Sequence, residues 1–145
     1  TAGTGKTYTV QVLLQELQER LKEKDLPLSF VRVAAPTGSA AFNMRFNAST
    51  IHRLIHWLNL RFFSVLTNQD RLHALQECLG DTQLVILDEI SMVGRQFMGK
   101  IDSRLEQGRK GKNPEQELLD GVSLLGVGDV AQCEAMLFDG VLVSG

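Results

Sequence analysis

The chain has 145 residues, of which 43% are hydrophobic, and a formal net charge of −2 at pH 7. This length and composition suit a single domain with a hydrophobic core. They exclude a protein that binds nucleic acid through a broad basic surface, so any such contact must be local and partly made by backbone groups. No run is long and apolar enough to span a membrane. The two cysteines, Cys78 and Cys133, have no metal-binding or redox spacing, so we expect an intracellular protein.

The chain opens on a glycine-rich turn. Residues 1–7 read Thr-Ala-Gly-Thr-Gly-Lys-Thr and match the end of the phosphate-binding P-loop, G-x-x-x-x-G-K-[ST], whose first glycine would fall one place before residue 1. In such a loop the backbone N–H groups point at the phosphates, the lysine neutralises them and the threonine binds Mg²⁺. The predicted nucleotide-binding residues are therefore Gly3, Thr4, Gly5, Lys6 and Thr7. The alternative is a glycine-rich turn with a chance lysine.

A helix is predicted directly after this turn, which is the context that a P-loop requires. Apolar residues recur there at helical spacing, in Val10, Leu13, Leu14, Leu17 and Leu21. Pro27 then ends the helix, because the residue before a proline avoids the α region.

The rest of the chain alternates predicted strands and helices. The expected elements, in chain order, are a strand at 29–35, a helical start at 39–42, helical patterns at 51–58 and 70–79, a strand at 83–87, a helix at 93–105, a basic loop at 107–114 and a strand at 122–127. The apolar run at 84–87 is typical of a strand buried on both faces of a parallel sheet. Residues 59–69 and 134–145 receive no assignment. This alternation predicts a parallel α/β sheet that is covered by helices on both sides.

An acidic pair follows the most apolar strand. Ligands of open α/β sheets bind at the carboxyl ends of the strands, and Asp88 and Glu89 stand directly after the 84–87 run. An apolar strand that ends in aspartate is a Walker B pattern, in which Asp88 would hold Mg²⁺ and Glu89 would polarise the attacking water as a general base. Alone, such a run is common. Together with the P-loop it predicts one shared site for a magnesium-bound nucleotide.

Three further polar segments follow or adjoin strands. Gln132, at the end of the run 128–132, would contact the γ-phosphate or the attacking water, or else belong to an ordinary turn. Residues 36–39 and 50–52 offer N–H groups, hydroxyls and one imidazole to a phosphodiester backbone. Taken alone, these two segments favour ordinary structural roles instead: helix N-caps at Ser39 or Thr50 and a partly buried His52.

With these residues assembled, the chain resembles the first motor domain of Pif-family DNA helicases, in the RecD-like branch of helicase superfamily one. Residues 2–7 are similar to motif I, and residues 35–41 together with 50–52 are similar to the motif Ia region. Residues 87–93, Leu-Asp-Glu-Ile-Ser-Met-Val, are similar to motif II, and residues 128–132 to motif III. The four motifs stand in the family's order and extend over most of the chain.

The resemblance implies a RecA-like P-loop NTPase domain with a parallel sheet flanked by helices, truncated at both ends. Residues 1–145 would form part of the N-terminal motor domain, and the second motor domain would lie outside them. The implied activity is an ATP- and Mg²⁺-dependent motor that moves on single-stranded DNA, usually 5′ to 3′, and unwinds duplex junctions. The implied roles lie in repair, recombination and telomere maintenance, in the nucleus or mitochondrion of a eukaryote. By motif, the ATPase residues would be Lys6, Thr7, Asp88, Glu89 and Gln132, and the DNA path would include Pro36, Thr37, Gly38 and His52.

The chain departs from the family pattern after Gln132, where Cys133-Glu134-Ala135 stand in place of Leu-Pro-Pro. The family fold would place the motif III strand between the strands of motifs I and II. Because the motif I strand would precede residue 1, we expect the motif III strand to have an open edge. The family's arginine finger belongs to the second motor domain. Since a missing finger costs about 10³–10⁵ in rate, we expect these residues alone to show little or no unwinding.

Two other interpretations stay open: another P-loop NTPase or kinase, and a degenerate module that binds nucleotide or partners without catalysis. The carboxylate of Glu89 favours hydrolysis over transfer to an acceptor. Elsewhere we expect ordinary structural roles. These are surface or helix-face positions for His56 and His73, and core or helix-packing positions in preference to base stacking for Trp57, Phe62 and Phe63. For residues 109–112 we expect a solvated loop or a weak DNA contact.

Overall fold

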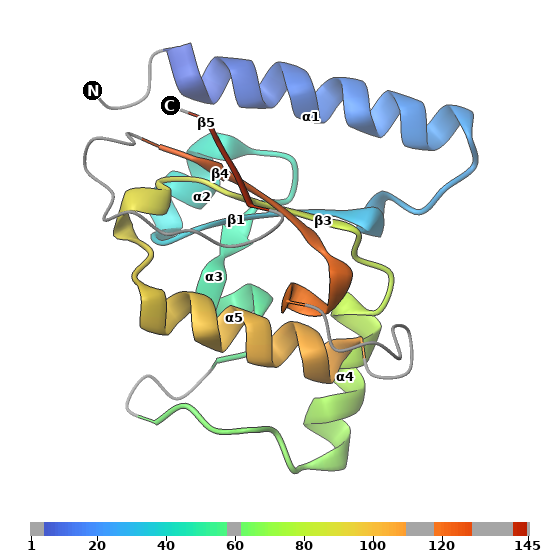
Figure 1. The fold of residues 1–145 in the computed structure, drawn as a ribbon. Coiled ribbons are helices and arrows are strands. Elements are labelled where there is room, and N and C mark those ends of the chain that lie inside the picture. The colour runs from blue at the N-terminus through green and yellow to red at the C-terminus, as the bar shows by residue number, and fades with distance from the viewer. Residues whose placement is uncertain (1–4, 58–61, 110–117, 129–140, 145) are drawn as a thin grey trace.

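The computed structural model describes residues 5–57, 62–109, 118–128 and 141–144, which form one parallel β-sheet with helices on both faces (Figure 1). The sheet has five strands in the order β2-β1-β3-β4-β5. Their bounds are Val31–Ala35 (β1), Ser49–Thr50 (β2), Leu84–Leu87 (β3), Ser123–Val127 (β4) and Val141–Ser144 (β5).

All the strand pairings are parallel, so the carboxyl ends of the strands lie along one edge of the sheet. Leu87, the last residue of β3, is level with Ala34 in β1 and with Gly126 in β4. The strands β1, β3 and β4 therefore end within one residue of the same line, and the segments that follow them start from a common edge.

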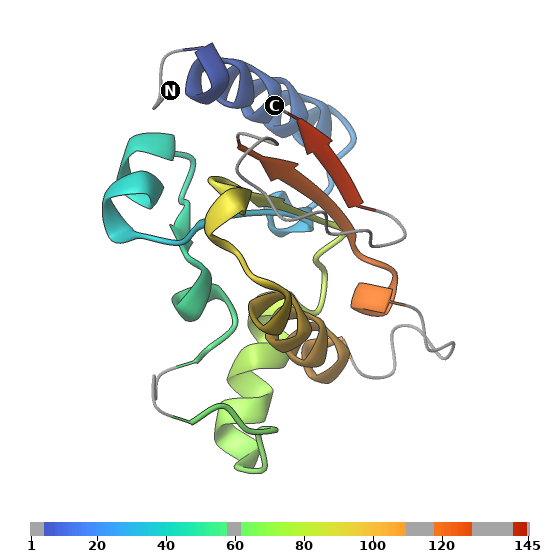
Figure 2. The ribbon, with the colours of Figure 1, turned by 60° about the vertical axis from the view of Figure 1, so that its left-hand side comes forward.

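Helices form a layer on each side of this sheet. The helices are Gly5–Glu23 (α1), Gly38–Met44 (α2), Ile51–Leu54 (α3), Gln69–Leu79 (α4) and Arg95–Gly108 (α5), with 3₁₀ turns at Leu28–Phe30 (η1), Ile90–Met92 (η2) and Leu118–Gly121 (η3). Helix α1 crosses one face, and α3, α4 and α5 lie on the other, as both views show (Figure 1, Figure 2). No helix in these ranges is both long and apolar enough to cross a membrane.

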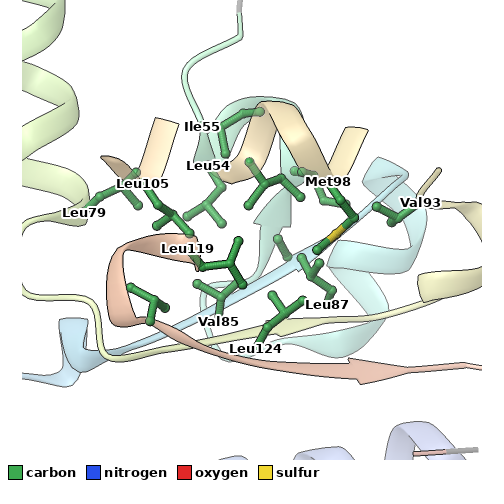
Figure 3. Packing of buried hydrophobic residues seen from close by; sticks show 14 of the residues in the cluster. Leu54, Ile55, Leu79, Val85, Leu87, Val93, Met98, Leu105, Leu119 and Leu124 are labelled. Carbon is green, nitrogen blue, oxygen red and sulfur yellow. The ribbon is translucent and has the colours of Figure 1, made fainter. Parts of the chain in front are cut away.

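The larger hydrophobic core lies between the sheet and helices α3, α4 and α5 (Figure 3). Val85 and Leu87 of β3 and Leu124 of β4 belong to it. Ile86, between Val85 and Leu87, and Leu125, directly after Leu124, instead pack on the face covered by α1. This alternation follows the two-residue period of a strand. Strand β3 is apolar throughout because both of its faces are covered.

A smaller core lies beneath α1. Val10 and Leu14 are 5% and 1% exposed, and they share a cluster with Val33, Ile86 and Val127. Val10 stands near the start of α1, and Val127 is the last residue of β4. Helix α1 accordingly begins over the carboxyl edge of the sheet and runs back across it (Figure 1).

Most of the predicted elements are confirmed: the helix after the glycine-rich turn is α1, the apolar run at 84–87 is β3, and two further predicted helices are α4 and α5. Several boundaries differ. Residues 107 and 108, expected in the basic loop, end helix α5 instead. Residues 28–30 form η1, so β1 starts only at Val31. Helix α3 stops at Leu54, well before the predicted end of the pattern at 58, and His56 just beyond it adopts a positive φ of 52° that breaks a right-handed helix.

The expectation of an open edge on the motif III strand is wrong. Strand β5, in a segment that received no assignment from sequence, pairs in parallel with β4 from Leu124↔Val141 to Val127↔Ser144. The backbone groups on that side of β4 therefore find partners within the sheet, which removes the liability of an edge strand.

Arg109 does not lie in a solvated loop, which corrects another expectation. Its side chain is 8% exposed, and its Nε donates to Oδ2 of Asp120 at 3.3 Å. One of its terminal nitrogens donates to the backbone oxygen of Thr82. The neighbouring glycine and lysines indicated a loop, but the partner that buries Arg109 comes from a distant turn. Residues 110–112 lie outside the described residues.

Arg104 connects the segment 62–68 to the core. Arg104 is only 3% exposed, and its guanidinium group donates hydrogen bonds to the backbone oxygens of Ile55 (3.0 Å) and Ser64 (2.7 Å). Gln107, one turn later in α5, bonds both the N–H and the carbonyl of Leu66. This segment is therefore held by side-chain bonds to its backbone, which a periodicity in sequence does not reveal.

Candidate nucleotide site

The predicted phosphate-binding and acidic segments occupy the same edge of the sheet. Asp88 follows β3 and Pro36 follows β1 at the carboxyl edge, and the first residues of α1 lie over that edge (Figure 1, Figure 2). Parallel strands that end level with one another bring these segments together, although more than 50 residues separate Pro36 from Asp88 in sequence. This edge is where open α/β sheets bind ligands.

The glycine-rich turn leads into the first turn of α1. Gly5, Lys6 and Thr7 begin this helix, whose free N–H groups and positive dipole end favour an anion. The first turn of α1 contains no acidic residue, so no carboxylate within it opposes such binding. Gly3 and Thr4, the other two predicted cradle residues, lie outside the described residues.

Asp88 is held at this edge by its backbone. Its N–H donates to the carbonyl oxygen of Ala34 at 2.9 Å, which extends the β1–β3 pairing by one residue. The carboxyl group is half-buried, and burial raises its pKa, an effect that a hydrogen bond from the Glu89 N–H partly opposes. None of the ion pairs among the described residues includes Asp88. The carboxylate therefore carries a desolvation cost that a bound cation would relieve.

The donors at this edge fit a magnesium ion bound to a nucleotide. Mg²⁺ prefers oxygen ligands, and proteins usually hold it through one or two carboxylates together with substrate phosphates. Asp88 and Thr7 are such oxygen donors. Across the described part of the chain, no cluster of three metal-ligating side chains exists that would form a complete protein cage. When bound, the ion would neutralise charge on the phosphates and on Asp88.

Glu89 adopts a left-handed backbone conformation, with φ 50° and ψ 49°. This conformation costs an L-residue roughly 1–2 kcal/mol, and strain of this kind clusters at functional sites. The Glu89 carbonyl accepts a hydrogen bond from Met92 N–H at 2.9 Å, which starts η2. The chain thus leaves the sheet abruptly, immediately after Asp88.

Replacing Asp88 with asparagine is expected to raise the unfolding temperature of the nucleotide-free protein at pH 7. The folded pKa of Asp88 lies above its ordinary value of 3.8, so the fold favours the protonated carboxyl group. Such a group contributes its full stabilisation of the fold when the pH is below its pKa in the unfolded chain. That contribution is lost as the pH rises through its pKa in the folded protein. The gain from asparagine should therefore shrink as pH falls towards 4, in thermal unfolding curves recorded across this range.

The control for this prediction is Asp81→Asn, at an exposed position after α4. It removes the same charge from a carboxylate that is exposed and not half-buried, so it should show no comparable gain at pH 7. A lower unfolding temperature for Asp88→Asn than for the parent protein at pH 7 would contradict the argument.

Thr37, a candidate DNA contact, caps helix α2. Its Oγ1 accepts a hydrogen bond from Ala40 N–H at 3.2 Å and lies 3.4 Å from Oγ of Ser39. The N-cap of α2 is therefore Thr37 and not Ser39. The N-cap expected at Thr50 is confirmed, because its hydroxyl accepts a hydrogen bond from Arg53 N–H at 3.3 Å at the start of α3. The neighbouring Pro36 is half-buried and Gly38 is exposed, beside the carboxyl end of β1.

His52 lies in an aromatic cluster next to α5. Its ring stacks on Trp57 with centroids 4.8 Å apart and meets the edge of Phe97 at 5.0 Å. Burial, and then the charge of Lys100, lower the pKa of His52, so the imidazole is neutral at pH 7. His52 can therefore offer a phosphodiester a hydrogen bond but no charge.

Sequence reasoning missed Lys100, whose Nζ lies 4.0 Å from the centroid of the Trp57 ring. This cation–π contact joins α5 to the loop after α3, and only the tertiary structure reveals it. The packing role expected for Trp57 and Phe63 is confirmed, because both belong to or pack against the larger core. The same expectation was wrong for Phe62, which is 73% exposed. Gln132 lies outside the described residues, so its role stays a prediction.

Comparison with known proteins identifies the family of this chain. Residues 1–136 match the family model described as an AAA domain. The chain is 31% identical over 137 residues to the ATP-dependent DNA helicase Pif1 of Psychrobacter sp. (strain PRwf-1). This match covers 91% of the chain and 18% of that protein.

Solved Pif1 structures share the fold. The Candida albicans Pif1 helicase superposes with a TM-score of 0.65 at 24% identity, over 89% of this chain and 27% of that one. Bacteroides Pif1 bound to ssDNA gives 0.61 at 26% identity, and Bacteroides Pif1 in complex with ADP-AlF3 and ssDNA gives 0.61 at 27%; each match covers 90% of this chain and 27% of the other. The chain thus spans about a quarter or less of the length of these relatives.

The family model covers residues 1–136, nearly the whole chain. The chain therefore belongs to the AAA domain family and is similar to Pif1 helicases in sequence and in fold.

Proposed function

We propose that the protein carrying this chain is an ATP-hydrolysing DNA helicase and that residues 1–145 supply part of its nucleotide site. The observation that carries the proposal is the position of the first turn of α1 and of the Asp88-Glu89 turn along one edge of the sheet. The choice of ligands is supported by a relative at 27% identity, the Bacteroides Pif1 helicase, which was solved with ADP-AlF3 and ssDNA.

Each predicted site residue has a part in this proposal. Lys6 and the N–H groups at the start of α1 bind the β- and γ-phosphates, and Thr7 and Asp88 hold Mg²⁺ beside them. Glu89 accepts the proton of the attacking water, and Gln132 contacts the γ-phosphate or that water. The raised pKa of Asp88 supports this assignment, since a half-buried carboxylate with no cation partner among the described residues favours a bound metal.

The proposal extends to the nucleic acid. Single-stranded DNA would pass along Pro36, Thr37, Gly38 and His52, and duplex junctions would be unwound, most simply in the 5′ to 3′ direction. Contacts from N–H groups, hydroxyls and a neutral imidazole suit a chain with a net charge of −2, because they bind phosphodiesters without a large basic surface. We further propose an intracellular role in DNA repair, recombination or telomere maintenance, in the nucleus or mitochondrion if the source is a eukaryote.

ATP turnover by the complete protein, with and without single-stranded DNA, tests the proposal. We expect DNA to stimulate turnover and Lys6→Ala to abolish the stimulated rate, because the phosphates lose their cation. Lys24→Ala is the matched control, since Lys24 is exposed beyond the other end of α1 and should be dispensable. Turnover that DNA leaves unchanged would favour a different P-loop NTPase, and nucleotide binding without turnover would favour a degenerate module.

A further inference from the structure

Gly126 leaves space for a side chain that adjoins the predicted catalytic pair. It lies in β4, level with Leu87, the residue before Asp88. A Cβ added at Gly126 would overlap Cδ1 of Ile90 and lie only 3.2 and 3.3 Å from its Cγ1 and Cβ. Ile90 follows Glu89 directly in sequence. Ile90 can therefore pack directly against β4 only because Gly126 has no side chain.

Ile90 has little freedom to move away. It is 2% exposed and belongs to the larger core, where close packing means that a displaced side chain displaces its neighbours. Its carbonyl accepts a hydrogen bond from Val93 N–H at 2.9 Å, and the Glu89 carbonyl accepts one from Met92 N–H at 2.9 Å. A push on Ile90 is consequently transmitted to η2 and to the strained turn at Glu89.

We propose that Gly126 is a positioning residue for ATP hydrolysis, which sets the place of Asp88 and Glu89 by admitting Ile90 into the sheet. The inference rests on the proposed function, because it assigns Gly126 to the same site. A glycine inside a buried strand weakens that strand, and such glycines often mark a close approach. The contact with Ile90 supplies that reason here.

The variant Gly126→Ala in the complete protein tests this inference. We expect kcat for ATP hydrolysis to fall by about 10²-fold, since a displacement of roughly 1 Å at a reacting group can cost that much. KM for ATP should change little, because the phosphate-binding turn belongs to α1 and not to η2. Gly99→Ala is the matched control: a Cβ there meets no atom within 4 Å, so kcat should stay at the parent value.

Rescue by Ile90→Val separates positioning from a general loss of folding. Valine lacks only Cδ1, the atom that the added Cβ would overlap. Ile90→Val alone should keep most of the parent kcat, and the double variant Gly126→Ala/Ile90→Val should recover most of what Gly126→Ala loses. A Gly126→Ala protein with the parent kcat, or a loss that Ile90→Val does not restore, would overturn the inference.

A readout without nucleotide keeps this inference distinct from the proposed function. The backbone amide resonances of Glu89 and Met92, recorded by NMR without nucleotide, should shift in Gly126→Ala and return towards the parent positions in the double variant. If the parent protein shows no ATP turnover, the proposed function fails, and these resonances still decide whether Gly126 positions the turn. Unchanged resonances in Gly126→Ala would then reject the positioning role.

Discussion

Glu89→Gln in the complete protein is expected to lower kcat for ATP hydrolysis by about 10²–10⁴-fold, the usual contribution of a positioned general base. Glutamine keeps the size of the side chain and the left-handed backbone at this position, so the change removes only the ability to accept a proton. Nucleotide affinity should stay close to that of the parent protein, because the predicted phosphate contacts lie on α1. Steady-state ATP turnover and equilibrium nucleotide binding, measured on the same preparation, check both halves.

The control for this variant is Glu106→Gln, an equivalent change at an exposed position on α5. It should leave turnover unchanged. The assignment of Glu89 as the base would be wrong if Glu89→Gln turned over ATP at the parent rate. A joint loss of binding and turnover would instead indicate that Glu89 shapes the site and does not act in proton transfer.

Arg109→Met is expected to destabilise the fold by about 3–5 kcal/mol, the usual cost of removing one partner from a buried ion pair. Both side chains of the Arg109–Asp120 pair are less than 10% exposed, at 8% and 9%. The substitution leaves Asp120 without its counter-charge and the Thr82 carbonyl without its donor. Urea unfolding of parent and variant should show this loss as a lower midpoint with an unchanged slope.

Two comparisons sharpen this prediction. Arg20→Met breaks the ion pair between Arg20 and Glu16, whose side chains are 69% and 56% exposed. This substitution should lower the free energy of unfolding by less than about 1 kcal/mol. Asp120→Asn added to Arg109→Met removes the unpaired charge and should recover part of the loss; asparagine suits this site because φ at Asp120 is 52°. Equal midpoints for Arg109→Met and Arg20→Met would show that burial does not determine the cost.

Local patterns in the sequence were sufficient for much of the fold. Apolar spacing predicted α1, α4 and α5, and the continuous run at 84–87 predicted a strand covered on both faces, because each of these signals repeats within one element. The pairing of a glycine-rich turn with an acidic pair predicted a common site, since parallel strands place their carboxyl ends along one edge. The geometry at that edge agrees, with Asp88 anchored to β1 through the Ala34 carbonyl.

Other features depended on partners that are distant in sequence. Arg109 was predicted to belong to a basic loop, because its partner Asp120 lies eleven residues away. The open edge expected on β4 is paired with β5, in a segment that received no assignment from sequence. The strained backbone of Glu89 and the space that Gly126 leaves for Ile90 also exist only where β3 and β4 lie side by side.

Residue patterns along the chain predicted the order of the elements, the parallel sheet and the polar residues that follow its strands. The folded chain was needed to show which charges are buried, which strand pairs with the outer side of β4 and how tightly the turn after β3 is packed. The physical reason is the range of the interactions. Periodicity and turn chemistry act between residues a few positions apart, whereas burial, ion pairing and close packing depend on segments that meet only after the chain has folded.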